Sequence, residues 1–185
     1  MRRLLISRVS AIVLFVVSTL WDAGATYLTL GHKLHLDGNP FSRGMDWKGL
    51  GVLHAVLGIL LVAFFILTYE KQHLLWPEEK VDFVGFLRRC LKENVSFRLT
   101  LQAKEKVYVA QVAFWTLIFA HTFAALITSS PLLGGPSFLD AARFFSETAV
   151  RYSQNATTLL IVAAAFICGH YPLYQVFLSD REASQ

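Results

Sequence analysis

The sequence predicts an all-α fold, a four-helix transmembrane bundle with one interfacial amphipathic helix on each side of the membrane. Three observations carry this prediction. The 185 residues are 55% hydrophobic with a mean hydropathy of +0.48, which is too apolar for an ordinary soluble domain. The apolar residues are gathered into four long blocks, and the Lys and Arg residues lie mainly on one side of the topology that these blocks define.

The four blocks cover about residues 9–30, 49–69, 107–128 and 157–178. Each has about 20 residues, the number that a helix rising about 1.5 Å per residue needs to cross about 30 Å of hydrocarbon. The last three blocks contain no charged residue, whereas a helix of a soluble bundle would carry charge on its outer face. We therefore expect a single integral membrane domain over residues 1–185.

The first block resembles a secretory signal peptide, because Arg2 and Arg3 precede an apolar run. However, the run is longer than a typical signal-peptide core. Trp21, Asp22 and Tyr27 also stand where small residues would mark a cleavage site. We interpret this block as a retained span.

The distribution of Lys and Arg predicts the orientation. Twelve of the 17 lie before the first block, in the 70–106 loop or after the fourth block, and five lie in the two opposite loops. The first side is therefore expected to be cytoplasmic, with both termini on it, in a prokaryotic inner membrane. The net charge of +4 then follows from topology, and no nucleic-acid partner is expected.

One amphipathic helix is predicted in the 70–106 loop. Pro77 suits a first helical position, and Phe83, Leu87 and Leu91 recur at helical spacing beside cationic residues. This helix either lies in the cytoplasmic interface or packs as a soluble helix on the inner end of the bundle. A second such helix is predicted on the outer side over 137–152, where Ser137 precedes an apolar stripe.

Ionisable side chains inside spans are costly in lipid and are therefore candidates for function. Here they are Asp22, His54, His121 and His170. At about 1.5 Å per residue, the first three lie about 12, 8 and 10 Å below the outer surface, in one layer. His170 lies about 20 Å down, in the inner half, and is expected to be structural.

The neighbours of these residues indicate that the outer three point towards one another. Asp22 shares a stripe with Ser18 and Thr26, and His121 is followed by small residues one turn later. His54 is framed by Gly51 and Gly58, which permit close helix contact. His54 is therefore the better placed of the two histidines to meet Asp22.

An Asp–His–His set in this layer has several interpretations. Asp22, His54 and His121, with His32 and His35 of the adjacent loop, could ligate a transition metal. Alternatively, His54 and His121 could bind haem, or the layer could be a proton relay. The structural alternative is that Asp22 bonds a histidine only to satisfy buried polar groups.

Residues 18–60 also contain the pattern Asp22-x3-Thr26-x4-Gly31, followed by Asn39-Pro40 and the second span. In this pattern the chain resembles a family of small uncharacterised prokaryotic multi-pass membrane proteins. The family places a lysine early in the second span, where this chain departs from it. The resemblance implies no activity and singles out Asp22, Thr26 and Asn39.

The sequence thus predicts a polytopic membrane protein whose outward-facing polar site binds a metal or haem, without a recognisable catalytic motif. A second hypothesis is a non-catalytic accessory subunit of a larger membrane complex or a homo-oligomer. A third is a proton-coupled carrier of small solutes. Whether the protein is an enzyme is left open by the sequence.

Overall fold

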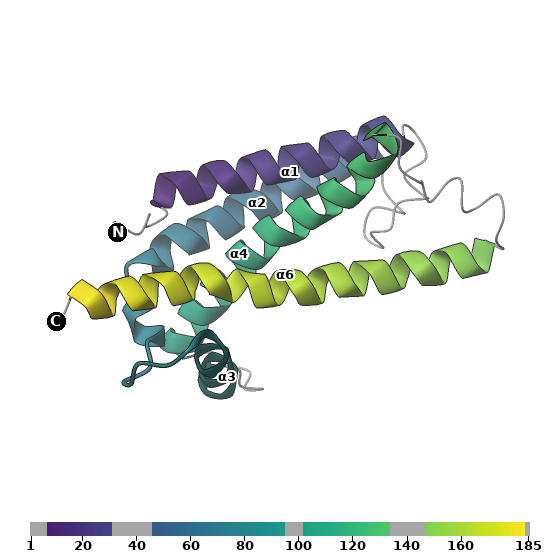
Figure 1. Ribbon diagram of the computed structural model, residues 1–185. Helices are drawn as coiled ribbons and strands as arrows, with labels where there is room; N and C mark the ends of the chain where they lie inside the picture. Colours follow the sequence, from purple (N-terminus) through teal and green to yellow (C-terminus); the bar gives the residue numbers. More distant parts are fainter. Residues whose placement is uncertain (1–6, 31–45, 95–101, 134–146, 184–185) are drawn as a thin grey trace.

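The computed structural model describes residues 7–30, 46–94, 102–133 and 147–183. Within these residues the chain is all-α, as predicted, and Figure 1 shows its long helices. The elements are α1 (Arg8–Leu30), α2 (Trp47–Tyr69), η2 (Gln72–Leu75), α3 (Phe83–Asn94), α4 (Ala103–Ser129), η3 (Ser130–Leu133) and α6 (Glu147–Ala183).

Helices α1, α2, α4 and α6 are each long and apolar enough to cross a membrane, which confirms the four predicted spans. The protein is therefore an integral membrane protein. The start of α1, the end of α6 and helix α3 lie at the same end of the bundle (Figure 1). We call this end the inner end, following the predicted orientation, and the opposite end the outer end.

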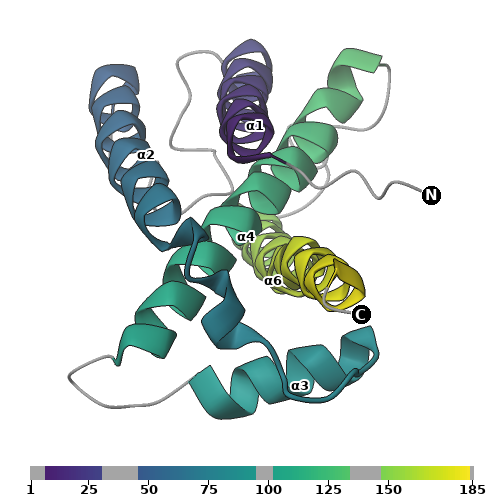
Figure 2. The same cartoon turned by 90° about the vertical axis from the view of Figure 1, so that its left-hand side faces the viewer.

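Helix α4 is the centre of the bundle, and α1, α2 and α6 all pack against it (Figure 2). Helices α1 and α4 run parallel, because their C-terminal ends meet. There Thr29 Oγ1 donates to the carbonyl of Thr128 at 3.1 Å, and Trp21 Nε1 donates to Ser129 Oγ at 3.3 Å. This parallel contact brings side chains of equal depth on α1 and α4 face to face.

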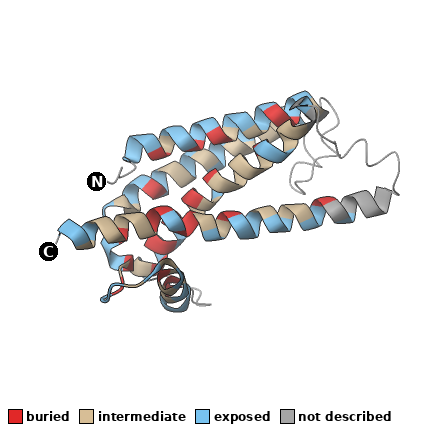
Figure 3. Ribbon diagram, in the orientation of Figure 1, coloured by how far each residue is buried: buried red, intermediate tan, exposed pale blue. Residues whose placement is uncertain are grey.

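The buried core lies mainly in the inner half, where α4 and α6 cross (Figure 3). The ring of Phe114 on α4 stacks on Phe65 of α2, with centroids 3.8 Å apart, and on Phe15 of α1 at 5.3 Å. Gly169 on α6 faces Thr116 so closely that a Cβ atom there would lie 2.9 Å from the Thr116 backbone nitrogen. Glycine is thus required where these two helices meet.

Helix α2 is the least enclosed of the four spans, because Phe65 is its single buried residue. Leu61 and Val62 pack partly against the core, and most other apolar side chains of α2 are exposed, as expected of a span that contacts lipid. Its first turn is fixed by Asp46, whose carboxylate accepts the Gly49 backbone N–H at 2.7 Å.

The amphipathic helix of the 70–106 loop is present as α3, but the predicted start at Pro77 is wrong. The helix begins at Phe83, because the Asp82 carboxylate accepts the Gly85 backbone N–H at 2.8 Å and caps it. Pro77 lies in the preceding turn, where its carbonyl accepts a hydrogen bond from Arg181 at 2.6 Å. That contact ties the turn to the end of α6.

The outer amphipathic helix predicted over 137–152 falls largely outside the described residues. Residues 147–152 belong to α6, which continues from Glu147 into the fourth span as one helix. The helix also passes through Pro172 without interruption. The fourth span is therefore part of a longer helix than the sequence predicted.

Candidate functional site

Helix α1 directs Asp22 towards the centre of the bundle. Ser18 and Thr26, one turn before and after it, are both buried. The Ser18 hydroxyl donates to the carbonyl of Phe15 at 3.0 Å, so its polar group is satisfied within its own helix. The predicted polar stripe of α1 therefore faces the protein, and Asp22 lies on its edge.

Asp22 is paired with His121 of α4. The Nδ1 atom of His121 donates to Oδ2 of Asp22 at 2.8 Å, and both side chains are partly buried. The two residues come from the parallel helices α1 and α4 at equal depth. The sequence-based expectation that Asp22 meets a histidine of this layer is thus confirmed.

His54 of α2 completes the layer without touching Asp22 directly. Its ring centroid lies 6.0 Å from that of His121, with an angle of 51° between the ring planes. Its Nδ1 atom donates to the carbonyl of Leu50 in the preceding turn at 2.9 Å. The structure therefore brings Asp22, His54 and His121 together through one hydrogen bond and one ring contact.

The expectation that His54 would be the nearer partner of Asp22 is wrong. A Cβ atom at Gly58 would lie 3.4 Å from the Phe15 ring, so α2 approaches α1 there through an aromatic side chain. At Gly51 a Cβ atom would meet nothing within 4 Å. The small residues of α2 thus do not bring the backbones of α1 and α2 together, and α4 supplies the closer histidine.

In both rings, Nδ1 is the hydrogen-bond donor and Nε2 is left as a possible acceptor. A carboxylate or carbonyl oxygen can only accept, so Nδ1 carries the hydrogen in His121 and in His54, and Nε2 has a lone pair in the neutral ring. Within the described residues neither Nε2 atom has a hydrogen-bond partner, and neither atom is fully buried. The site therefore presents two fixed imidazoles, each with an open acceptor nitrogen.

The remaining predicted residues of this site cannot be placed beside it. His32 and His35, together with Asn39, lie outside the described residues. In the part of the chain that the structure describes, no three His, Cys, Asp or Glu side chains are grouped so as to hold a metal ion. The described layer by itself thus supplies two imidazoles and one carboxylate that already bonds one of them.

A second group of polar residues lies in the inner half, and sequence reasoning found only one of its members. His170 of α6 is fully buried; its Nδ1 donates to the carbonyl of Phe166 at 2.7 Å. Its Nε2 therefore accepts from the hydroxyl of Tyr108, 2.9 Å away on α4. Every polar atom of this pair has a partner, as expected for a structural histidine.

Gln111 of α4 is the centre of another inner network. Its amide nitrogen donates to the carbonyl of Phe65 at 3.0 Å and to the Thr68 hydroxyl at 2.8 Å. Its Oε1 accepts from the Gln72 amide at 2.7 Å. A search confined to ionisable residues misses Gln111, although an amide within an uncharged span is a comparable signal.

No known protein family, curated protein or solved structure matches this chain. The resemblance carried by Asp22, Thr26 and Asn39 therefore stays a prediction.

Proposed function

We propose that this membrane protein binds a transition-metal ion in its outer half, through Nε2 of His54 and Nε2 of His121. The observation that carries the proposal is the matched fixation of the two rings. Each donates Nδ1–H to a fixed oxygen, Asp22 Oδ2 or Leu50 O, and each leaves Nε2 open. An open acceptor nitrogen at membrane depth is unfavourable unless water or a ligand reaches it.

The distance between the rings supports a shared ion. A metal bound at about 2.0 Å from a ring nitrogen lies about 3 Å from the ring centre, so two imidazoles on one ion have centroids about 5 to 6 Å apart. The centroids of His54 and His121 are 6.0 Å apart. One ion between the two Nε2 atoms is therefore compatible with the positions of α2 and α4.

In this proposal Asp22 acts as the orienting partner of His121. Histidines that bind metals commonly donate their second ring N–H to a carboxylate or a carbonyl, which fixes the tautomer and raises the basicity of the ligating nitrogen. Asp22 and the Leu50 carbonyl are the corresponding acceptors here. A complete coordination shell needs further ligands, and His32 and His35 in the adjacent loop are the proposed donors.

The test is the metal content of the purified full chain, measured by inductively coupled plasma mass spectrometry. We expect about one transition-metal ion per chain, and loss of that ion in His54→Ala and in His121→Ala. Asp22→Asn should retain the fold and weaken metal affinity by about 10- to 100-fold, because only the orienting group changes. A visible absorbance band would identify the iron of a haem rather than a free ion.

His73→Ala is the matched control. Its Nδ1 also donates to a backbone carbonyl, that of Glu70 at 3.0 Å, but its side chain is exposed and lies in the short segment η2, away from the outer layer. Its removal should leave the metal content unchanged. A wild-type protein that binds no metal when Zn²⁺, Cu²⁺ and Fe²⁺ are supplied would overturn the proposal, and so would equal losses in His73→Ala and His121→Ala.

The direct bond between Asp22 and His121 favours a second candidate function, proton transfer. A carboxylate hydrogen-bonded to an imidazole can exchange a proton with it, and His54 is near enough for a water to connect the two rings. Metal-free protein in liposomes would then conduct protons, and Asp22→Asn would abolish the conduction. If neither metal binding nor proton conduction is found, an accessory subunit becomes the best explanation, with co-purifying chains as its test.

A further inference from the structure

Helix α3 packs against the inner parts of α6 and α4. Figure 2 shows it beside the end of α6 and the start of α4, away from α1 and α2. The Phe83 ring contacts Tyr171 and Tyr174 of α6 at centroid distances of 5.7 and 5.5 Å, and Phe86 stacks on Phe177 at 5.5 Å. These α6 residues belong to the uncharged part of the fourth span, and we therefore place α3 at the level of the membrane interface.

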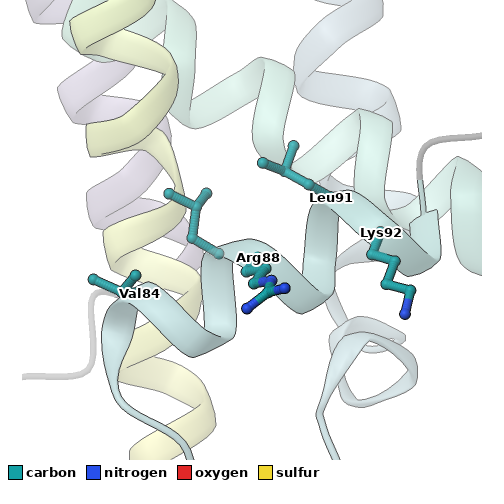
Figure 4. Close-up of a pocket in the computed structure, with 5 residues that line it drawn as sticks. Val84, Arg88, Leu91 and Lys92 are labelled. Carbon is teal, nitrogen blue, oxygen red and sulfur yellow. The ribbon is translucent and has the colours of Figure 1, made fainter.

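The two sides of α3 have different surroundings. Phe86 and Cys90 are buried against the bundle. Val84, Leu87 and Leu91 form a second apolar stripe at spacings of three and four residues. Val84 is 69% exposed and Leu91 37%, and the three residues line a shallow depression (Figure 4). Leu87, between them, is partly exposed, so much of this stripe is uncovered within the described residues.

Two cations border the stripe. Arg88 and Lys92 line the same depression, and in Figure 4 the side chains of Leu91 and Lys92 point to opposite sides of the helix. The ion pairs of this end use other cations, as in Arg89 with Glu79 at 2.9 Å. Within the described residues neither Arg88 nor Lys92 forms an ion pair, although both lie in an acid-containing segment.

We propose that this surface of α3, formed by Val84, Leu87, Arg88, Leu91 and Lys92, binds an anionic phospholipid. An acyl chain would cover the apolar stripe, and the lipid phosphate would lie between the two cations. Apolar side chains below and cations at headgroup level are the arrangement by which an amphipathic helix selects anionic lipid. The depth of α3 favours a lipid over a soluble partner, which would require the stripe to lie in water.

The test is competition between lipids for the purified full chain. The protein in detergent is equilibrated with an equal mixture of phosphatidylglycerol and phosphatidylcholine, and native mass spectrometry measures which lipid is retained. We expect the wild type to retain mainly phosphatidylglycerol. The double variant Arg88→Gln/Lys92→Gln should lose about tenfold in this preference, because each cation near an anionic surface contributes a several-fold gain.

The control variant is Lys71→Gln/Lys106→Gln, which removes the same charge from two exposed positions at the same end that do not line the depression. It should keep the preference. Equal loss in both double variants would reduce the effect to overall charge and overturn the site. Equal retention of the two lipids by the wild type would also overturn it. Val84→Ser/Leu91→Ser should weaken binding of both lipids, and an unchanged lipid occupancy in that variant would contradict the role of the stripe.

Discussion

The outer and inner polar groups of this bundle differ in how completely they are satisfied. In the inner half, the Tyr108 hydroxyl and both ring nitrogens of His170 have partners. In the outer half, His54 and His121 each use Nδ1 and leave Nε2 open. Both groups contain histidine at membrane depth, so residue type alone does not distinguish them.

The difference separates a structural role from a binding role. A polar network whose donors and acceptors all have partners stabilises a helix contact and has nothing left to bind a ligand. A network with open acceptors at the same depth is unfavourable by itself and requires water or a ligand. Inner substitutions should therefore reduce stability, and outer substitutions should reduce ligand binding with little loss of stability.

A reversed orientation would exchange the two ends of the bundle in this comparison, so topology has the largest expected effect. We predict that both termini are cytoplasmic. Green fluorescent protein fused after Gln185 should therefore fluoresce, and alkaline phosphatase fused at the same point should be inactive. The opposite pattern would place α3 and its cations on the outer side and the layer of Asp22, His54 and His121 towards the cytoplasm.

Replacing His170 by Ala should cause the largest loss of stability. The substitution leaves the Tyr108 hydroxyl without its acceptor and opens a cavity between α4 and α6, which together cost about 2 to 3 kcal/mol. The free energy of unfolding can be measured from helical circular dichroism during titration with sodium dodecyl sulphate. His54→Ala should change it by less than half as much; equal losses would mean that both halves are structural.

The pair Gln72 and Gln111 allows a double-mutant cycle on the inner network. Gln111→Leu alone should cost about 1 to 2 kcal/mol, because the Gln72 amide and the Phe65 carbonyl lose their partner. Adding Gln72→Leu should recover part of this loss, since the pair is then apolar on both sides. Additive losses in the same unfolding assay would show that the 2.7 Å bond between the two amides contributes no coupling.

Asp22 and Asp46 provide the corresponding test in the outer half. Within the described residues, Asp22 accepts a hydrogen bond from His121, and Asp46 accepts one from the first turn of α2. Each Asp→Ala change should cost about 1 kcal/mol of stability. Only Asp22→Ala should lower metal affinity, by about 10- to 100-fold, in a Zn²⁺ titration followed by calorimetry. Similar affinity in the two variants would remove Asp22 from the proposed site.

The spans could be read from the sequence because a membrane leaves few alternatives. A run of about 20 residues without charge has to cross the bilayer or be buried completely, and depth then follows from counting residues. For this reason the common layer of Asp22, His54 and His121 could be predicted. Depth allowed either histidine as the partner of Asp22, and the structure joins Asp22 to His121 and not to the expected His54.

The features that could not be predicted depend on how each helix is rotated about its axis and on contacts of uncharged side chains. Successive side chains of a helix point in directions about 100° apart, and the sequence does not fix how each helix is rotated about its axis. Depth alone therefore could not decide between His54 and His121 as the partner of Asp22. The partner depends on tertiary contacts such as that of Phe15 with Gly58, which the sequence pattern does not contain. Likewise, Pro77 and Asp82 both suit a helix start, and the contact of the Pro77 turn with Arg181 favours the later one.

The smallest expected effect concerns the side of α3 that faces the bundle. Burial, with a smaller contribution from Glu93, raises the pKa of the Cys90 thiol from 9.0 to about 12. The protonated thiol is therefore favoured in the folded chain. Stability should be unaffected below pH 9 and should fall between pH 9 and 12, where the unfolded thiol ionises first.

The raised pKa also predicts slow alkylation, because the thiolate is the reactive form. In a Cys168→Ser variant at pH 8, N-ethylmaleimide should modify Cys90 at least 100-fold more slowly in the folded protein than in sodium dodecyl sulphate, as followed by intact mass. The proposed lipid surface lies on the opposite side of α3 from this thiol. Alkylation should therefore stay slow whether or not phosphatidylglycerol is present, whereas lipid-dependent labelling of Cys90 would mean that α3 leaves the bundle to meet the membrane.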